Sequence, residues 1–406
     1  MRYFVQFSTA YDGTVNPVQK HLSKVLPEVG LPYNPHFLEH PTWISWAVGA
    51  TDWYEDEAEF VLLEDYQNVG EFLHTAVVKS KTEPVRIFGS VLDANKDLWY
   101  MLIPGLAHLD YPVTVNLGGY ITDPEEWIES IEHVVSVRWF SDISLLSNKD
   151  DRVKPDHRLL AHIPAIPRLT MSTGCNFICD FCTIPRRVTA LDIADVVTQV
   201  ASFKGLDFEY IYLDDKTFGQ AENYRDIGWI KHMVLEYNPK FKGFIVQTTV
   251  GVLDKHYIEF ADLGVVFAEI GVEIPDDKFL EKMHKPYRVH MLEKLMDKHK
   301  ERWDTGKSVI RIIPNILFGV PGDDYEASLS WLDANMRYLS HVNPFILSFY
   351  EEAKNASGLL DGRIPEAGDD DETQINRSWL TASEVRLLEE ALDSTFFLVE
   401  DWLGVR

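Results

Sequence analysis

The 406-residue chain has 46% hydrophobic and 25% charged residues, which is ordinary for a globular protein and leaves room for two or three domains. Its formal net charge of −26 repels nucleic-acid backbones at long range, so we expect no bulk nucleic-acid partner. No basic segment followed by an apolar run opens the chain, and no apolar run approaches the ~18 residues of a membrane span, so we expect neither a signal peptide nor a transmembrane helix.

Short apolar runs alternate with helical patterns through residues 1–150. The sequence predicts strands over residues 3–8, 43–48, 60–63, 85–91, 113–117 and 134–139. It predicts helices over 18–25, 69–78 and 98–109, and a further helix that begins at Asp123-Pro124. Strands and helices that alternate at this spacing are typical of a parallel, doubly wound sheet, so we expect residues 1–150 to form a Rossmann-like α/β domain.

The predicted strand at 113–117 runs into a glycine pair, Gly118 and Gly119, shortly before the helix that begins near Asp123. Glycine lets a ligand approach the backbone closely, and a helix N-terminus favours an anion. We therefore predict that Gly118 and Gly119 contribute to a cofactor site, although such pairs also end strands that bind nothing. A polar, charged segment at 147–155 then separates this domain from the rest.

All three cysteines of the chain, Cys175, Cys179 and Cys182, lie within eight positions in the pattern C-x3-C-x2-C. Three thiolates on one loop suit a soft metal or an iron–sulfur cluster, and their number leaves one coordination position open. A zinc site would need a fourth protein ligand, for which only His157 and His162 are at hand, and a disulfide would leave one thiol over. We favour the cluster, keep zinc as the alternative, and expect a reducing, cytoplasmic location.

Six further apolar segments alternate with helical patterns and predict a parallel barrel, or part of one, over residues 156–350. The predicted strands are 166–171, 210–213, 244–249, 265–272, 310–318 and 345–350, and the predicted helices are 193–203, 227–237, 253–262, 278–283, 289–302 and 325–338. Residues 351–406 predict an acidic loop and then a C-terminal helix, which begins with a capping-box pattern at Thr381–Glu384 and packs on the barrel.

Polar residues and glycines follow the predicted barrel strands, which is where barrel enzymes carry their chemistry. An acidic pair in this position is otherwise a helix cap, and Pro-Gly is otherwise only a turn. Because several such residues coincide at strand ends, we predict a ligand site that includes Asp214, Asp215, Thr248, Glu273, Asn315, Gly319 and Gly322.

The cysteine spacing, with Phe181 immediately before the last cysteine, resembles the radical SAM superfamily. There the three cysteines hold three irons of a [4Fe–4S] cluster, and S-adenosylmethionine (SAM) binds the fourth. The resemblance implies that Cys175, Cys179 and Cys182 are the catalytic cluster ligands of a (β/α)6 partial barrel that cleaves SAM reductively. It also implies an external electron donor of the flavodoxin or ferredoxin type, and a small-molecule or peptide substrate.

The resemblance places the other predicted site residues around SAM. Gly271-Val-Glu273 matches the motif whose acid binds the ribose hydroxyls, and two carboxylate oxygens suit a vicinal diol. Acids replace the glycines of the superfamily at the strand end that contacts the SAM amino group. The remaining matches are Phe181, Asp214, Asp215, Thr248, Asn315, Gly319 and Gly322 as cofactor contacts, with Lys285 and Arg288 as candidates for the SAM carboxylate.

The first domain resembles the cobalamin-binding domain that precedes the barrel in one class of this superfamily, through Ile87–Val91, Val115–Gly119 and Asp123–Glu125. The chain lacks the D-x-H-x-x-G signature that supplies an axial histidine. Bound cobalamin is therefore an open question. Two reactions are open: cobalamin-dependent methyl transfer, and adenosyl-radical chemistry without cobalamin. The alternative to both is a noncatalytic iron–sulfur or zinc protein.

Overall fold

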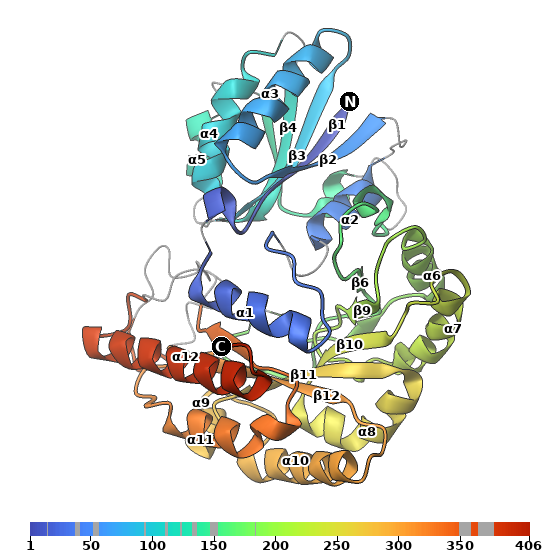
Figure 1. The fold of residues 1–406 in the computed structure, drawn as a ribbon. Helices are drawn as coiled ribbons and strands as arrows, with labels where there is room; N and C mark the ends of the chain where they lie inside the picture. Colours follow the sequence, from blue (N-terminus) through green and yellow to red (C-terminus); the bar gives the residue numbers. More distant parts are fainter. Residues whose placement is uncertain are drawn as a thin grey trace. The chain divides into compact units, whose positions relative to one another are not determined.

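The structure is a computed structural model, and the chain divides into two compact units (Figure 1). Unit 1 comprises Met1–Asn16, Asn34–Ala165 and Ala201–Asp207, and unit 2 comprises Pro17–Tyr33, Ile166–Val200 and Phe208–Arg406. The residues that the structure describes are 1–13, 15–36, 41–51, 57–92, 95–109, 113–121, 124–131, 136–146, 153–182, 184–348, 359–363 and 377–406.

Unit 1 is built on a five-stranded parallel sheet with the strand order β2-β1-β3-β4-β5. The strands are β1 (Arg2–Phe7), β2 (Ala58–Leu63), β3 (Val85–Leu92), β4 (Val113–Tyr120) and β5 (Ser136–Phe140). The helices α3 (Tyr66–Ser80), α4 (Lys96–Leu106) and α5 (Pro124–Ile131) connect successive strands. This order, which reverses direction at β1, confirms the predicted doubly wound, Rossmann-like sheet.

Alternate side chains of β1 face two different cores, because successive residues of a strand point to opposite faces of its sheet. Tyr3, Val5 and Phe7 are buried in one core with residues of α3, α4 and α5. Phe4 lies in the second core, where its ring stacks on Phe88 with the centroids 4.8 Å apart. Both faces of the sheet are therefore covered.

Residues 43–48 were predicted as a strand, and this prediction was wrong because they belong to the helix α2 (Thr42–Ala50). A short apolar run fits a buried strand and a buried helix equally well in the sequence. In the structure Ile44, Ala47 and Val48 share one helical face and pack in the core that contains Phe4. Helix α2 thus covers the second face of the sheet of unit 1.

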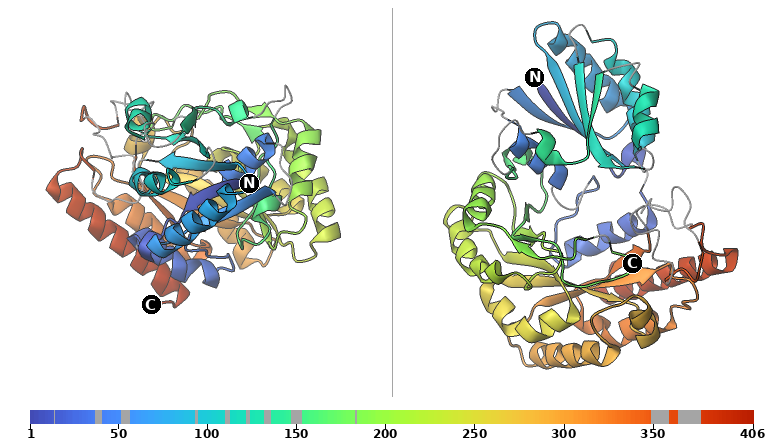
Figure 2. Two further views of the ribbon diagram at one scale, coloured as in Figure 1. Left: turned by 90° about the horizontal axis from the view of Figure 1, so that it is seen from above. Right: turned by 180° about the vertical axis from the view of Figure 1, so that it is seen from behind.

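Unit 2 contains a six-stranded parallel sheet whose strands follow one another in space as in the sequence, in the order β13-β12-β11-β10-β9-β6 (Figure 2). Its strands are β6 (Arg168–Leu169), β9 (Tyr210–Leu213), β10 (Gly243–Thr248), β11 (Val265–Glu273), β12 (Arg311–Phe318) and β13 (Asn343–Ile346). The helices between them are α6 (Ile193–Ser202), α7 (Ile227–Tyr237), α8 (Val250–Leu263), α9 (Asp277–Lys282), α10 (Val289–Asp304) and α11 (Glu326–Asn335). This curled sheet with its helices confirms the predicted partial barrel.

Helix α1 (Pro17–Glu28) precedes most of unit 1 in the sequence but packs on the sheet of unit 2. Leu26 of this helix, with Val29 and Leu31 just after it, shares a core with residues of β9, β10, β11 and β12. The Arg311 guanidinium donates a hydrogen bond to the Val29 carbonyl at 2.7 Å. The sequence did not predict this placement, because the apolar face of a helix does not specify which surface it will cover.

The C-terminal helix α12 (Ala382–Leu403) begins with the predicted capping box. The Thr381 hydroxyl accepts from the Glu384 N–H at 3.3 Å, and the Glu384 carboxylate accepts from the Thr381 N–H at 2.8 Å. The helix packs against α1 and α11 (Figure 1). The acidic loop predicted before it lies largely outside the described residues. In the part of the chain that the structure describes, no helix is both long and apolar enough to cross a membrane.

Candidate functional site

The three cysteines lie on one loop that follows the first strand of the partial barrel. At its base β7 (Ser172–Thr173) pairs antiparallel with β8 (Thr189–Ala190). Within it the Cys175 N–H donates to the Pro185 carbonyl at 2.9 Å. All three thiols are free, and Cys182 is exposed. The loop is therefore closed by backbone hydrogen bonds while its sulfurs stay available as ligands.

Gly174 lets the chain turn directly before the first cysteine. Its φ is +80°, in the left-handed region that favours glycine, and a Cβ at this position would collide with the carbonyl oxygen of Arg187. The returning half of the loop thus lies against the residue that precedes Cys175. Gly174 was not among the predicted site residues, although a glycine immediately before the first cysteine was a signal that the sequence offered.

The donor set, three free thiols on one loop, fits an iron–sulfur cluster, which binds cysteine as the thiolate. Burial raises the pKa of the Cys179 thiol to about 11, and the charges of Lys285, Glu273 and the other two cysteines act on it less strongly. The Thr217 hydroxyl lies 3.3 Å from the Cys175 sulfur. No group of three or more His, Cys, Asp or Glu side chains among the described residues surrounds one point as a single metal ion requires. The cysteine ligands of a [4Fe–4S] cluster bind different irons and need not converge on one point.

Asp215, which follows β9, holds the start of the cysteine loop. Its buried carboxylate accepts hydrogen bonds from the Met171 N–H at 3.2 Å and from the Ser172 hydroxyl. Its neighbour Asp214 pairs instead with the Arg168 guanidinium at 2.6 Å. The two acids predicted together thus make separate contacts, and Asp215 is the one that contacts the segment leading into the cysteines.

Burial raises the pKa of the Asp215 carboxyl from 3.8 to about 7. A carboxyl with a raised folded-state pKa stabilises the fold below its unfolded pKa and loses that contribution as the pH rises through the folded value. We therefore expect the unfolding free energy of the cluster-free protein to fall between pH 4 and pH 7, by on the order of 1–4 kcal/mol from this group. Asp215→Asn should remove most of that fall, and the adjacent Asp214→Asn should keep it.

Urea denaturation of the three proteins across this pH range measures the effect. Superimposable pH profiles for the wild-type protein and Asp215→Asn would contradict a buried, titrating Asp215.

Glu273 ends β11 with φ at +56°, an uncommon conformation for a residue other than glycine. The buried Lys285 ammonium donates to the Glu273 carboxylate at 2.7 Å and lies 5.7 Å from the centre of the Phe181 ring. These three side chains therefore meet beside the cysteine loop. The sequence placed Glu273 and Phe181 in one site but did not predict that Lys285 would pair with Glu273.

A second link joins the cysteine loop to the segment after α9. The Asp180 N–H donates to the Met283 carbonyl at 3.2 Å, and the Asp180 carboxylate lies 2.8 Å from the His284 ring nitrogen Nδ1. Asp180 lies between the last two cysteines in the sequence. The loop is thus held from two sides, by the end of β9 and by this segment. Neither Asp180 nor His284 was among the predicted site residues.

Thr248 on β10 and Asn315 on β12 are both buried, and β11 lies between their strands. The Thr248 hydroxyl donates to the Phe218 carbonyl at 2.9 Å, and the Asn315 amide oxygen accepts from Asn343 at 3.3 Å. These bonds join neighbouring segments at the edge of the sheet. The cofactor roles predicted for Thr248 and Asn315 stay predictions.

The turn from Gly319 to Gly322 follows β12, and both glycines have positive φ, +83° and +78°. The Gly319 N–H donates to the Tyr325 hydroxyl at 3.2 Å, and its carbonyl accepts from the Trp379 indole at 3.0 Å. A Cβ at Gly322 would meet nothing within 4 Å, so the positive φ of this residue, and not a lack of space, favours glycine there. The turn is anchored to the C-terminal segment, and its predicted contact with adenine stays a prediction.

The glycine pair of unit 1 borders a cavity of about 410 Å³ at the carboxyl ends of β3, β4 and β5. Gly119 has φ at +140°, and a Cβ there would collide with the carbonyl oxygen of Val91. Doubly wound sheets bind their ligands at this edge. No histidine is among the described residues that line the cavity, which include Trp43, Phe88, Ser90, Asn116, Gly118, Phe140 and Asp142.

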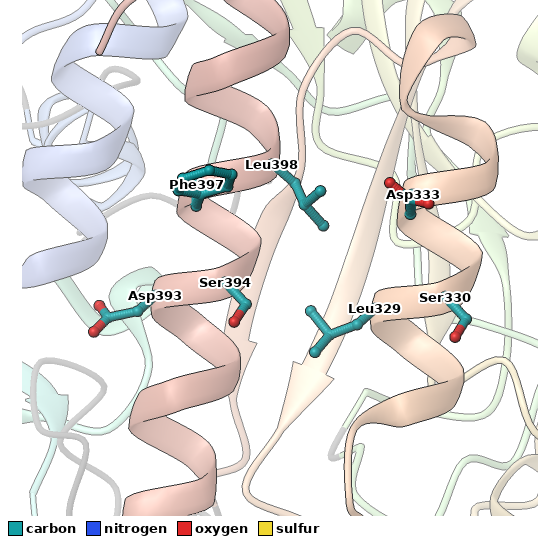
Figure 3. Close-up of a pocket in the computed structure, with 7 residues that line it drawn as sticks. All are labelled: Leu329, Ser330, Asp333, Asp393, Ser394, Phe397 and Leu398. Atoms are coloured by element: carbon teal, nitrogen blue, oxygen red, sulfur yellow. The ribbon is translucent and has the colours of Figure 1, made fainter.

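A second cavity, of about 630 Å³, lies between α11 and α12 (Figure 3). None of the predicted site residues lines it, so it is separate from the candidate site. Its lining residues are Leu329, Ser330 and Asp333 of α11 and Asp393, Ser394, Phe397 and Leu398 of α12.

Comparison with known proteins gives two kinds of similarity. The family model described as the Radical SAM superfamily matches residues 169–332, which contain the cysteine loop and the strands β9 to β12. No curated protein matches the chain.

Two solved structures share the fold at low sequence identity. One is the radical S-adenosylmethionine methyltransferase TsrM from Kitasatospora setae, with cobalamin and a [4Fe–4S] cluster bound: 12% identity over 86% of this chain and 72% of that chain, with a TM-score of 0.51. The other is the cobalamin-dependent S-adenosylmethionine radical enzyme OxsB with aqua-cobalamin bound, at 15% identity and a TM-score of 0.54. That match covers 95% of this chain but only 57% of the OxsB chain.

Proposed function

Because the chain belongs to the radical SAM superfamily through residues 169–332, we propose that it is an enzyme that cleaves SAM reductively and modifies a small-molecule or peptide substrate. The observation that carries this proposal is the single loop with three free thiols, held between the end of β9 and the segment after α9. When bound there, a [4Fe–4S] cluster supplies the electron that splits a carbon–sulfur bond of SAM.

The residues of the chain bind and orient the reactants in this proposal. Cys175, Cys179 and Cys182 bind the cluster, and Asp215 positions the start of their loop. Glu273 keeps one carboxylate oxygen for the ribose hydroxyls, while Lys285 occupies the other. The further proposed SAM contacts are Phe181, Asp214, Thr248, Asn315, Gly319 and Gly322.

We further propose that a first domain, over residues 1–150, binds cobalamin at the cavity that Gly118 and Gly119 border, and that the reaction is methyl transfer. The fold shared with two structures that contain cobalamin supports this proposal, as does a cavity with aromatic and polar walls at the carboxyl edge of the sheet. The second candidate is adenosyl-radical chemistry without cobalamin, which the lack of a D-x-H-x-x-G signature favours.

Hydroxocobalamin is expected to bind the purified chain at one equivalent, with a change in its visible absorption spectrum. Gly119→Ala should weaken this binding at least ~10-fold, because the added Cβ displaces the edge of the cavity at a cost of over ~1.4 kcal/mol. Gly13→Ala is the matched control, since Gly13 has φ at +72° but open space around it. Absence of binding to the wild-type chain would remove the cobalamin proposal and leave the second candidate.

The proposed electron donor is an acidic carrier of the flavodoxin or ferredoxin type, in a cytoplasmic location. A net charge of −26 disfavours its approach over most of the surface. Arg186 and Arg187, both exposed, stand four and five positions after Cys182 and offer a local basic contact beside the thiols.

The remaining proposed domains are the partial barrel at 156–350 and the C-terminal segment at 351–406.

Anaerobic reconstitution with iron and sulfide tests the proposed function. The chain should turn brown and, with SAM and dithionite, release 5′-deoxyadenosine, or S-adenosylhomocysteine when cobalamin is present. A colourless protein that holds one zinc and leaves SAM intact would favour the noncatalytic alternative.

A further inference from the structure

Lys285 and Glu273 form an ion pair that is shielded from solvent next to the cysteine loop. Their charged atoms are 2.7 Å apart, and only 7% and 11% of the two side chains is exposed. A Cβ at Gly271 would lie 3.0 Å from the Lys285 ammonium and 2.6 Å from the Glu273 carboxylate. The glycine two residues before Glu273 therefore makes room for the pair.

The two charges act on the cluster ligands with opposite signs. The Lys285 ammonium lies 5.7 Å from the centre of the Phe181 ring, and Phe181 stands between Cys179 and Cys182 in the loop. Lys285 also interacts electrostatically with Cys182. The positive end of the pair thus lies against the cysteine loop.

The backbone fixes the positions of both charges relative to the loop. Glu273 adopts a left-handed conformation at a shift in the pairing register of β11 and β12. Lys285 follows Met283 and His284, which are hydrogen-bonded to Asp180 of the loop. A buried charge at a fixed distance from a redox centre acts strongly, because little water screens it.

We infer that Lys285 and Glu273 set the reduction potential of the cluster by opposing electrostatic effects, with Lys285 favouring the reduced form. This inference rests on the proposed function. Reduction adds one electron, taken from the electron donor, to the [4Fe–4S]2+ cluster and makes it more negative. Lys285 stabilises that added charge and Glu273 destabilises it, so the pair determines how strong a donor the enzyme needs.

A redox titration of the reconstituted chain without SAM, followed by EPR, tests the inference. Lys285→Gln should lower the midpoint potential, Glu273→Gln should raise it, and the double variant should lie between the two. Lys285→Arg keeps the charge and should stay close to the wild-type value. Lys282→Gln is the matched control, because Lys282 lies only three positions before Lys285 but pairs with the exposed Asp361.

Shifts of the same sign in Lys285→Gln and Glu273→Gln, or shifts no larger than in Lys282→Gln, would overturn the inference. If Lys285→Gln does not assemble a cluster, the other two variants decide. The midpoint potential should then rise in Glu273→Gln and stay unchanged in Lys285→Arg, and the inference is overturned if either result is missing. A wild-type chain that assembles no [4Fe–4S] cluster refutes the proposed function itself, which is a different result from an intact cluster with an unchanged potential.

Discussion

Cys179→Ala is expected to lose the cluster and to reduce SAM cleavage by about 10³-fold or more, because the cofactor carries the radical step and the protein has no substitute for it. Cys179 lies between the other two ligands and is more buried than the exposed Cys182. Its loss leaves two thiols, which cannot hold three irons. Iron and sulfide content per chain, together with 5′-deoxyadenosine release, measures the result.

The matched control for this substitution is Ile178→Ala. Ile178 is the preceding residue of the same loop, and 51% of it is exposed, so its truncation should leave cluster content and cleavage near the wild-type values. The circular dichroism spectrum of Cys179→Ala should resemble that of the wild-type chain, since the thiol is small. Retained cleavage in Cys179→Ala would refute the role assigned to the loop.

Gly174→Ala is expected to remove most of the bound iron although it changes no ligand. Alanine strains the positive φ and drives its Cβ into the Arg187 carbonyl, at a combined cost of about 2–5 kcal/mol. The backbone must then move, and the hydrogen bond from Cys175 to Pro185 lies next to the change. Iron content measures the loss of the cluster, and the midpoint of urea denaturation measures the loss of fold stability.

Gly306→Ala separates strain from collision. Gly306 also has a positive φ, +66°, but a Cβ there would meet nothing within 4 Å. Gly306→Ala should lower the free energy of unfolding by only about 1 kcal/mol and keep the full cluster content. Equal iron loss in Gly174→Ala and Gly306→Ala, or none in either, would show that the close approach of Arg187 does not matter for the loop.

The architecture of both sheets could be predicted from the sequence because alternating apolar and helical patterns dictate parallel β/α units. Helix α7 was predicted at its observed bounds, and the capping box of α12 at its observed residues. The pattern failed at residues 43–48, where an apolar run too short to show a period forms α2. It could not place α1, whose partner in unit 2 is distant in sequence.

The candidate site could be predicted only in part, for a related reason. Cysteine spacing is local, so the loop was recognisable from the sequence alone. The Lys285–Glu273 pair depends on the return of the chain after α9 and on a register shift at the end of β11. Gly174 depends on a close approach of Arg187, thirteen positions later. Such contacts follow from tertiary structure and not from any periodicity in the sequence.

The EPR spectrum of the dithionite-reduced, reconstituted chain, recorded with and without SAM, shows whether a [4Fe–4S] cluster forms on the three cysteines and binds SAM. We expect the signal of one reduced [4Fe–4S] cluster per chain and a change in that signal when SAM is added, because SAM binds the iron that the cysteines leave open. A signal that saturating SAM does not alter, or a chain that takes up zinc and no iron, would contradict this expectation.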